Sequence, residues 1–142
     1  MQVFIIGNPL ETAQVLDSKR FNKQIIETKQ ILSTLKGDSD AWKNHPCVLQ
    51  YKNHINWLEY YERCFLEYKK GNYVLALSAS ILATEHTPPF HTPEYFDQMK
   101  RRLYTKNPYH YKVWKDLGES NINWYWVENE WRYYSGGKRI IL

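Results

Sequence analysis

The sequence predicts a mainly α-helical protein, a compact single-domain bundle over residues 1–142 with an extended or hairpin-like aromatic segment at the C-terminal end. Three observations support this fold class. The length of 142 residues suits one domain. Hydrophobic residues make up 43% of the chain, near the usual share of globular proteins, which excludes wholesale disorder. Apolar side chains recur at helical spacing in several segments.

The first long helix is predicted to begin at Asp17 or Ser18, either of which can cap it, and to end near Leu35. Its apolar positions share one helical face, at spacings i, i+4, i+7, i+11 and i+14: Phe21, Ile25, Thr28, Leu32 and Leu35. Before it lies a short β-branched and aromatic run that Gly7-Asn8-Pro9 breaks, and the polar segment 37–40 ends the helix.

Four further helices are predicted from apolar spacing and terminal signals. One runs from Pro46 to Lys70 and stops at Gly71-Asn72, and a short apolar one covers about Tyr73–Ala83. Thr92-Pro93 is an N-cap followed by proline at the first helical position, and it opens a helix that continues through Leu103. Asn107-Pro108 repeats that signal and predicts a helix ending at Gly118.

The C-terminal segment has a different pattern. Residues 123–127 and 131–134 are rich in aromatic rings, and Gly136-Gly137 follow, which is typical of strands joined by tight turns. The run Trp131-Arg132-Tyr133-Tyr134 places a cation among rings, and rings can stack on exposed nucleic-acid bases. The alternative is a strand whose alternate rings cover a core, and the pattern does not separate the two.

Charge and aromatic content favour nucleic acid as a partner. Nineteen Lys and Arg against 15 Asp and Glu give a net charge of +4, and 16% of the residues are aromatic. Six cations and no acid lie between residues 98 and 115: Lys100, Arg101, Arg102, Lys106, Lys112 and Lys115. Such a block suits phosphate binding, although a solvated basic face has the same composition.

Several classes of protein lack support. No apolar run is long enough to span a bilayer or to form a signal-peptide core, so we expect no membrane association and a location in the cytoplasm or nucleoid, with a viral gene as one possible source. Cys47 and Cys64 lack metal-ligand spacing and are predicted to be buried reduced thiols. No P-loop or GxGxxG motif occurs, and neither a metal nor a cofactor is expected.

Glu27 is the carboxylate that the sequence singles out. On the first long helix, six residues lie within roughly 60° of it: Arg20, Lys23, Gln24, Gln30, Ile31 and Thr34. A carboxylate beside cations stays ionised, which suits a group that stabilises a positive centre or moves a proton near an anionic polymer. The simpler interpretation is a surface Lys23–Glu27 pair of about 0.3–0.5 kcal/mol.

These residues carry a resemblance to a known family. The block from Leu16 to Glu27 resembles the first helix of the pyrimidine-dimer DNA glycosylases, the group of phage endonuclease V, in which a Leu lies eleven residues before the essential Glu. Asn44-His45-Pro46 followed by His54 is similar to that family's second-helix entrance, where a His near the damaged site follows a Pro by eight residues. Residues 131–134 with Lys138 resemble its aromatic, basic C-terminus.

The resemblance implies an all-α enzyme that excises a base from damaged double-stranded DNA without metal or cofactor. The N-terminal α-amine, here that of Met1, attacks C1′, and the Glu, here Glu27, assists sugar opening. A Schiff base then permits strand cleavage. An α-amine is a usable nucleophile near neutral pH because part of it is unprotonated. The implied DNA contacts are made by Arg20, Lys23, His54, Trp131, Arg132, Tyr133, Tyr134 and Lys138.

The chain departs from the family prototype near Glu27. Ile26 and Gln30 stand where the prototype has arginines, and Gln2 replaces a small residue, so Met1 is expected to be retained. Three alternatives stay open: a glycosylase for another modified or oxidised base, a non-catalytic DNA-binding protein on the same scaffold, and a purely structural or protein-interaction role. A monomer is expected, and no role is assigned to three histidines: His45, His91 and His110.

Overall fold

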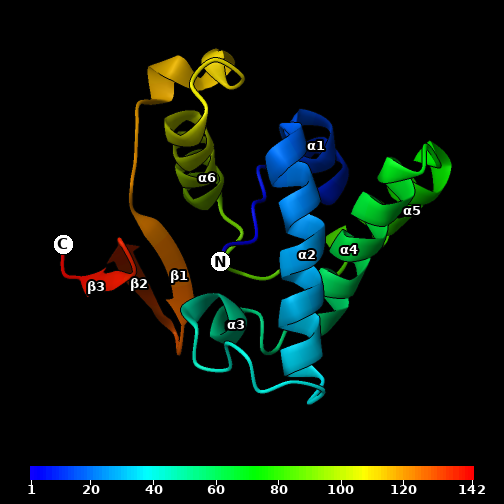
Figure 1. Cartoon of the computed structure of the whole chain (residues 1–142), viewed down its shortest axis with the longest axis horizontal. Coiled ribbons are helices and arrows are strands. Elements are labelled where there is room, and N and C mark those ends of the chain that lie inside the picture. Colours follow the sequence, from blue (N-terminus) through cyan, green and yellow to red (C-terminus); the bar gives the residue numbers. More distant parts are fainter. The chain divides into compact units, whose positions relative to one another are not determined.

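The computed structural model describes all residues from Met1 to Leu142, in seven helices and three strands, so the predicted mainly helical class with a C-terminal hairpin is confirmed (Figure 1). The contacts divide the chain into two compact units, residues 1–88 and residues 89–142. None of the helices combines the length and the apolar character needed to cross a bilayer.

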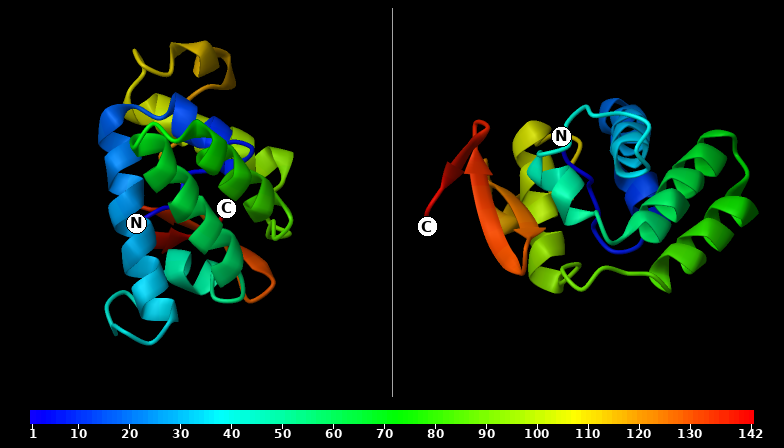
Figure 2. Two further views of the ribbon diagram at one scale, coloured as in Figure 1. Left: turned by 90° about the vertical axis from the view of Figure 1, so that its right-hand side faces the viewer. Right: turned by 90° about the horizontal axis from the view of Figure 1, so that it is seen from below.

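All the regular secondary structure of unit 1 is helical. Its helices are α1 (Pro9–Val15), α2 (Ser18–Leu35), α3 (Pro46–Gln50), α4 (Ile55–Lys69) and α5 (Tyr73–Thr84). Helix α4 packs along α5 as an antiparallel hairpin, and α1 and α2 also contact α4 (Figures 1 and 2). The chain therefore builds this unit around α4.

Helix α1 was not predicted, because Gly7-Asn8-Pro9 was interpreted only as the end of an extended run. Asn8 instead caps the helix: its Oδ1 accepts a hydrogen bond of 2.8 Å from the Glu11 N–H, and Pro9 occupies the first turn. A proline at that position removes an N–H that has no partner within the helix.

Helix α2 begins and ends as predicted. At its C-terminal end the Gly37 N–H donates to Thr34 O at 3.1 Å and the Asp38 N–H donates to Ser33 O at 2.9 Å, with Gly37 at φ +85°. This is the Schellman arrangement, which stops a helix with a residue in the left-handed region. Of the predicted apolar stripe, three members are buried (Ile25, Thr28 and Leu32) and two are half-buried (Phe21 and Leu35).

The single helix predicted from Pro46 to Lys70 is wrong, because residues 51–54 form a turn between α3 and α4. Tyr51 and Trp57 are fully buried, and their rings stack with centroids 5.4 Å apart. In a continuous helix, residues six positions apart point about 120° away from one another and could not stack. The break allows both rings to enter the core.

The core of unit 1 is mostly aromatic. Tyr61 and Phe65 have no exposed surface, and Phe21 stacks on Phe65 at 5.1 Å. Cys47 and Cys64 are buried free thiols, as predicted, and burial raises the pKa of each to about 12.

Unit 2 begins with α6 (Pro93–Lys106), whose N-cap is Thr92 as predicted: its Oγ1 accepts from the Tyr95 N–H at 3.2 Å. The helix predicted from Asn107 to Gly118 is shorter than expected, a 3₁₀ helix η1 (Lys112–Leu117) after a turn. Residues three apart eclipse one another in a 3₁₀ helix. A contact of the same spacing leads into it: the ring of Tyr111, its N-cap, stacks on Trp114 at 5.3 Å.

The predicted hairpin is a three-stranded antiparallel meander of β1 (Asn123–Val127), β2 (Glu130–Ser135) and β3 (Lys138–Ile140). Positive φ values at Glu128 and Asn129, and again at Gly136 and Gly137, make both connections two-residue turns of the type that matches strand twist. Residues Tyr125 and Val127 of β1 are buried, and α6 contacts this strand.

Candidate active site

The N-terminal segment is bonded to one face of α2 through the Gln24 side chain. Gln24 Oε1 accepts from the Phe4 N–H at 2.8 Å, and its Nε2 donates to Gln2 O at 2.9 Å. Both the oxygen and the nitrogen of the Gln24 side-chain amide thus bond to the main chain of the segment. Gln24 is only 1% exposed, and the Tyr61 hydroxyl donates to Phe4 O at 2.6 Å, which fixes the segment from α4 as well.

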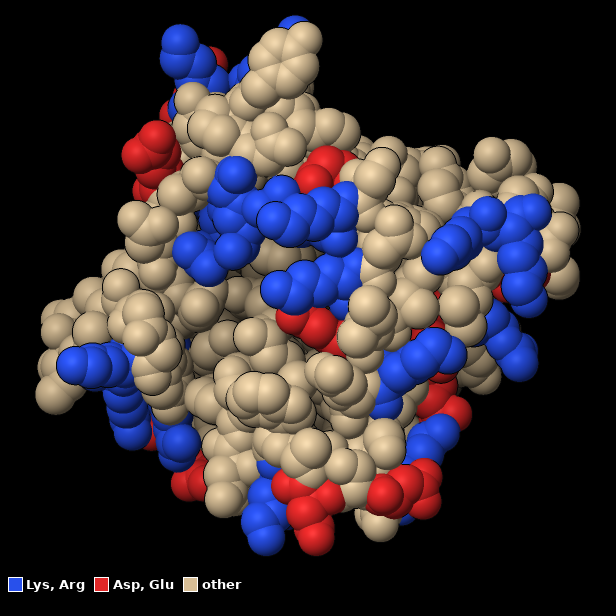
Figure 3. Space-filling view, in the orientation of Figure 1, with Lys and Arg blue, Asp and Glu red and all other residues tan.

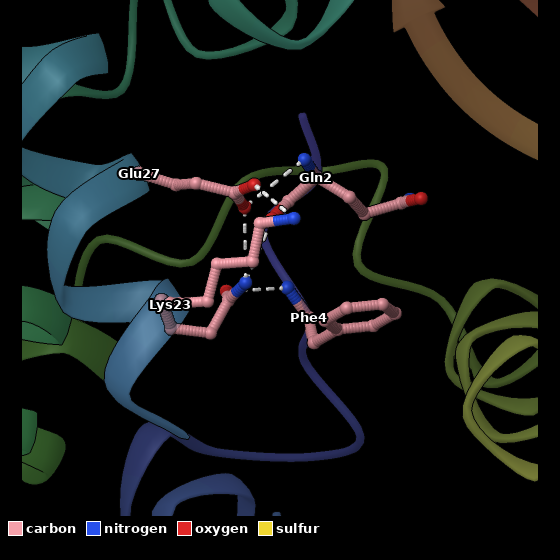
Figure 4. A network of polar contacts seen from close by, with 5 residues as sticks. Gln2, Phe4, Lys23 and Glu27 are labelled. Atoms are coloured by element: carbon pink, nitrogen blue, oxygen red, sulfur yellow. Dashed lines mark hydrogen bonds and ion pairs between the residues drawn. The ribbon is translucent and has the colours of Figure 1, made fainter. Parts of the chain in front are cut away.

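Glu27 lies one turn further along the same face and is 8% exposed (Figure 4). Its Oε2 accepts from the Gln2 N–H and from Gln24 Nε2, each at 3.3 Å. Its Oε1 lies 4.0 Å from Lys23 Nζ, and the Lys23 side chain is 65% exposed. A surface ion pair therefore does not describe this carboxylate, because amide N–H groups inside the protein supply its hydrogen bonds.

The bond to Gln2 places the carboxylate one peptide unit from the chain terminus. Because one residue spans at most about 3.6 Å, the Met1 α-nitrogen lies within about 7 Å of Glu27 Oε2. Gln24 and Glu27 extend the buried side of α2 beyond the apolar stripe, since the segment from Gln2 to Phe4 covers them.

His45 is a neighbour of the chain terminus to which the sequence assigned no role. It caps α3, and its Nδ1 accepts from the Cys47 N–H at 3.0 Å. Burial, and next the positive charge of the Met1 terminus, lower the pKa of His45 from 6.5 to about 4. His45 is therefore neutral at pH 7 and carries its proton on Nε2. The signal in the sequence was its position directly before Pro46, where capping residues lie.

Two of the predicted DNA contacts on α2 have different environments. Arg20 Nη1 is 3.1 Å from Asp17 Oδ2, and its side chain is only 17% exposed, so it is bound at the start of the helix. Lys23 extends into solvent beside Glu27. Figure 3 shows Lys and Arg side chains beside the N-terminal half of α2 and, within unit 2, over α6.

His54 is the N-cap residue of α4 and lines a cavity of about 410 Å³. The cavity walls also include Lys52, Asn53, Trp57 and His86, so polar groups and aromatic rings surround the space. Burial lowers the pKa of His54 below its usual 6.5, which favours the neutral ring at pH 7.

The hairpin of unit 2 separates the predicted aromatic run into two faces. In the register, Trp131 pairs with Trp126 and Tyr133 pairs with Trp124, and these four half-buried rings make edge-to-face contacts at 5.2 to 5.6 Å. Arg132 and Tyr134 point to the other face, since side chains alternate along a strand. The interleaved rings and cation of the sequence therefore do not form one surface.

Acidic side chains of the hairpin neutralise its arginines. Arg132 lies 3.0 Å from Glu130 and 3.2 Å from Glu128, and Arg139 lies 3.2 Å from the same Glu130 oxygen. The Arg132 hydrogen bond lowers the pKa of Glu130. Lys138 is exposed in β3. Hence neighbouring acids partly cancel the positive charge of Arg132 and Arg139.

Unit 1 is a helical unit that holds its first peptide against a buried carboxylate. A family model described as pyrimidine dimer DNA glycosylase matches residues 1–77, more than half of the chain. The chain belongs to this family, so the resemblance drawn from the sequence is confirmed. Comparisons with curated proteins and with solved structures gave no match.

Membership in this family implies DNA glycosylase activity on damaged DNA. The matched residues include the N-terminal segment, helices α1 to α4 and the first part of α5. Met1, Glu27, His45 and His54 all lie within the match, whereas the hairpin of unit 2 lies beyond it.

Proposed function

We propose that this protein is a DNA glycosylase with an associated AP lyase activity, with the Met1 α-amine as nucleophile and Glu27 as the catalytic carboxylate. The observation that carries the proposal is the hydrogen bond of 3.3 Å from the Gln2 N–H to Glu27 Oε2. It supports these roles because it fixes the carboxylate close to the amine before any substrate binds. Such fixed placement converts an encounter between groups into a reaction within one complex.

The chemistry proceeds through a covalent intermediate. The unprotonated amine forms a bond to C1′ of the damaged nucleotide, the glycosidic bond breaks, and the base leaves with the electron pair and takes up a proton. The sugar ring opens to a Schiff base that carries positive charge. Loss of a proton from C2′ then expels the 3′ phosphate by β-elimination, and water hydrolyses the Schiff base to regenerate the amine.

The two oxygens of Glu27 have different tasks in this scheme. Oε2 is held by the Gln2 and Gln24 donors, while Oε1 makes only the 4.0 Å approach to Lys23. Oε1 is therefore the oxygen that faces the substrate, where it stabilises the cationic intermediate and accepts a proton as the sugar opens. The exposed Lys23 ammonium binds an adjacent phosphate.

Further DNA contacts belong to the same proposal. The neutral His54 ring beside its cavity and the Arg20 guanidinium contact the strand near the lesion. Within the hairpin, the exposed parts of the Trp131 and Tyr133 rings stack on bases, and Arg132, Tyr134 and Lys138 bind the backbone. The enzyme acts on duplex DNA in the cytoplasm or nucleoid, and a single chain contains every reacting group. Distortion of the duplex is least costly at damaged steps, which contributes selectivity.

The substrate that the family description names is a pyrimidine dimer. A second candidate is another modified or oxidised base, because Ile26 and Gln30 replace the two prototype arginines next to Glu27. Ile26 is 56% exposed and offers an apolar surface where the prototype offers a cation. A panel of duplexes, each with one lesion, distinguishes these candidates: cleavage confined to dimers excludes the second.

The decisive experiment is borohydride trapping on UV-irradiated duplex. Wild type is expected to form a covalent complex, whereas Glu27→Gln and a protein with a chemically blocked α-amine are not. Glu59→Gln is the matched control, since Glu59 also pairs with a lysine, Lys36 at 3.3 Å, but on the exposed face of α4. This control should be trapped like wild type.

Two results would contradict the proposal. Equal trapping of Glu27→Gln and wild type would remove Glu27 from the chemistry. Salt-sensitive binding of duplex without any cleavage or trapping would instead identify a non-catalytic DNA-binding protein on this scaffold. A purely structural role predicts no binding even at low salt.

A further inference from the structure

Helix α5 exposes an unusual amount of apolar surface for a surface helix. Five of its twelve residues are large hydrophobic side chains in contact with solvent: Tyr73 (62% exposed), Val74 (82%), Leu75 (54%), Leu77 (48%) and Ile81 (55%). Together they expose on the order of several hundred Å² of apolar surface, the size at which a patch marks an interaction site. We call these five residues the α5 patch.

The packing of α5 leaves this patch uncovered. Its opposite side consists of small residues, Ala76, Ala79 and Ala83, which are buried, the first two in a cluster with Cys64 of α4. In Figures 1 and 2, α4 lies along one side of α5 and the other side faces outward. The sequence of α5 is therefore apolar on both faces, as for a helix that packs between two partners.

Val74, Leu77 and Ile81 follow the spacing i, i+3, i+7, which is the a–d–a pattern of a helix that packs against another helix. Ser78, exposed beside Leu77, is small enough to allow two helix backbones to approach closely. The partner that this stripe fits is accordingly a helix with apolar side chains at the same spacing.

We propose that the partner is α5 of a second copy of this chain, in an antiparallel pair with two-fold symmetry. Such an interface must be complementary to itself. A two-fold axis between Leu77 and Ser78 places Val74 of one copy level with Ile81 of the other, and each Leu77 level with the small Ser78. With Ser78 included, the positions 74, 77, 78 and 81 are thus symmetric about the midpoint between Leu77 and Ser78.

The charges at the two ends of α5 favour the same orientation. Lys69 and Lys70 precede its N-terminal end and Glu85 follows its C-terminal end, so an antiparallel pair brings lysines of one copy near the glutamate of the other. Lys70 also lies 3.9 Å from Glu67 of its own chain, which leaves the exposed Lys69 as the principal partner for Glu85. A parallel pair would instead oppose like charges at both ends.

The dimer differs from the monomer expected from the sequence and is independent of the proposed glycosylase chemistry, which needs only one chain. The α5 patches of two copies together bury an area at the lower end of the ~1,200–2,000 Å² of total surface that stable complexes bury. A reversible dimer is therefore expected. Dimer formation gives each assembly two candidate active sites.

Sedimentation of the full chain over a range of concentrations tests the proposal. Wild type is expected to shift from monomer to dimer, and Val74→Glu should raise the dissociation constant at least tenfold. Val113→Glu is the matched control, because Val113 is an 80% exposed valine in η1, and it should dimerise like wild type. A monomer at every concentration, or equal weakening by both variants, would overturn the proposal.

Cross-linking identifies the orientation. Ser78→Cys should form an intermolecular disulfide on oxidation because residue 78 lies next to the two-fold axis, whereas Ser18→Cys, an exposed serine of α2, should not. The native thiols of Cys47 and Cys64 are buried and should not form intermolecular disulfides. Lys69→Glu should weaken the dimer and Lys69→Glu with Glu85→Lys should restore it. Failure of this restoration together with equal cross-linking of both cysteine variants would overturn the antiparallel α5 pair.

Discussion

The carboxylates Glu130 and Glu27 both lie beside cations, but different groups hold them. Glu130 on the hairpin has two arginines at 3.0 and 3.2 Å but is exposed to solvent. Glu27 has its lysine only at 4.0 Å, yet it is buried and bonded to amide N–H groups. Glu130 thus has the shorter ion pairs but is held less firmly than Glu27, because water screens exposed charges. Burial and amide donors, rather than ion-pair distance, distinguish the candidate site.

The largest effect is expected at Glu27. Glu27→Gln keeps the shape of the side chain and an oxygen for the two N–H donors but removes the charge that stabilises a cationic intermediate. Base excision should fall by roughly 10²–10⁴-fold while DNA binding changes little. Single-turnover cleavage of lesion-bearing duplex measures the loss, with Glu59→Gln as the unaffected control.

Removal of the amide that ties the N-terminal segment to α2 should come next. Gln24→Ala leaves the Phe4 N–H and Gln2 O without these partners in a buried place, and we expect a loss of about 2–4 kcal/mol in unfolding free energy. Urea denaturation measures it. Gln30→Ala on the exposed side of the same helix should change stability by less than ~0.5 kcal/mol. Equal losses would show that the tie to the segment does not stabilise the fold.

A smaller effect is expected from pH at His45. Its pKa is about 4 in the folded protein and near 6.5 when unfolded, so the unfolded chain binds more protons between these values. The contribution of neutral His45 to the unfolding free energy is therefore full above pH 6.5 and is lost as the pH falls toward 4. The loss is on the order of 1 kcal/mol, because solvent screens a half-buried group.

Urea titrations at pH 7 and pH 4.5 measure this difference. His45→Asn keeps a capping side chain but cannot titrate, so it should reduce the loss at low pH. The exposed His110→Asn should not. Part of the loss will persist in His45→Asn because burial also lowers the pKa of His54.

The smallest effect is expected on the hairpin. Glu130→Gln releases Arg132 and Arg139 from a shared carboxylate, so duplex affinity should rise by about twofold, and more at low salt than at high salt. Glu119→Gln removes the same charge from unit 2 without releasing either arginine. Titration of labelled duplex at two salt concentrations compares them, and an equal gain would indicate a general charge effect.

Local signals in the sequence predicted the elements that end at glycines or begin at capped prolines. Gly37 and Gly71 stop α2 and α4 through the hydrogen bonds of their own turns, and Thr92 starts α6. The pair Asn8-Pro9 at the start of α1 carries the same kind of signal, a capping side chain followed by proline in the first turn. The break between α3 and α4 was not predictable in this way, because it depends on a stack between Tyr51 and Trp57 in the folded core.

The candidate site was predicted in part. Spacing and resemblance identified Glu27 and grouped it with Lys23 and Gln24 on one face of a helix. What periodicity cannot show is that a segment 20 or more positions away covers that face and buries the carboxylate. His45 was missed for the same reason, since only the fold brings α3 near the chain terminus. On the hairpin, strand alternation is enough to separate Trp131 from Arg132, but it does not give the register that pairs Trp131 with Trp126.

The bond from Tyr61 to the main chain at Phe4 spans 57 positions and has a consequence for synthesis on the ribosome. The first residues leave the exit tunnel first, but they acquire their buried partners only after α2 and α4 have followed. Contacts between distant positions form late, because the chain between them must first be ordered. The segment from Gln2 to Phe4 therefore lacks its buried partners for most of translation, and its pairing with α2 is completed only when unit 1 is nearly whole.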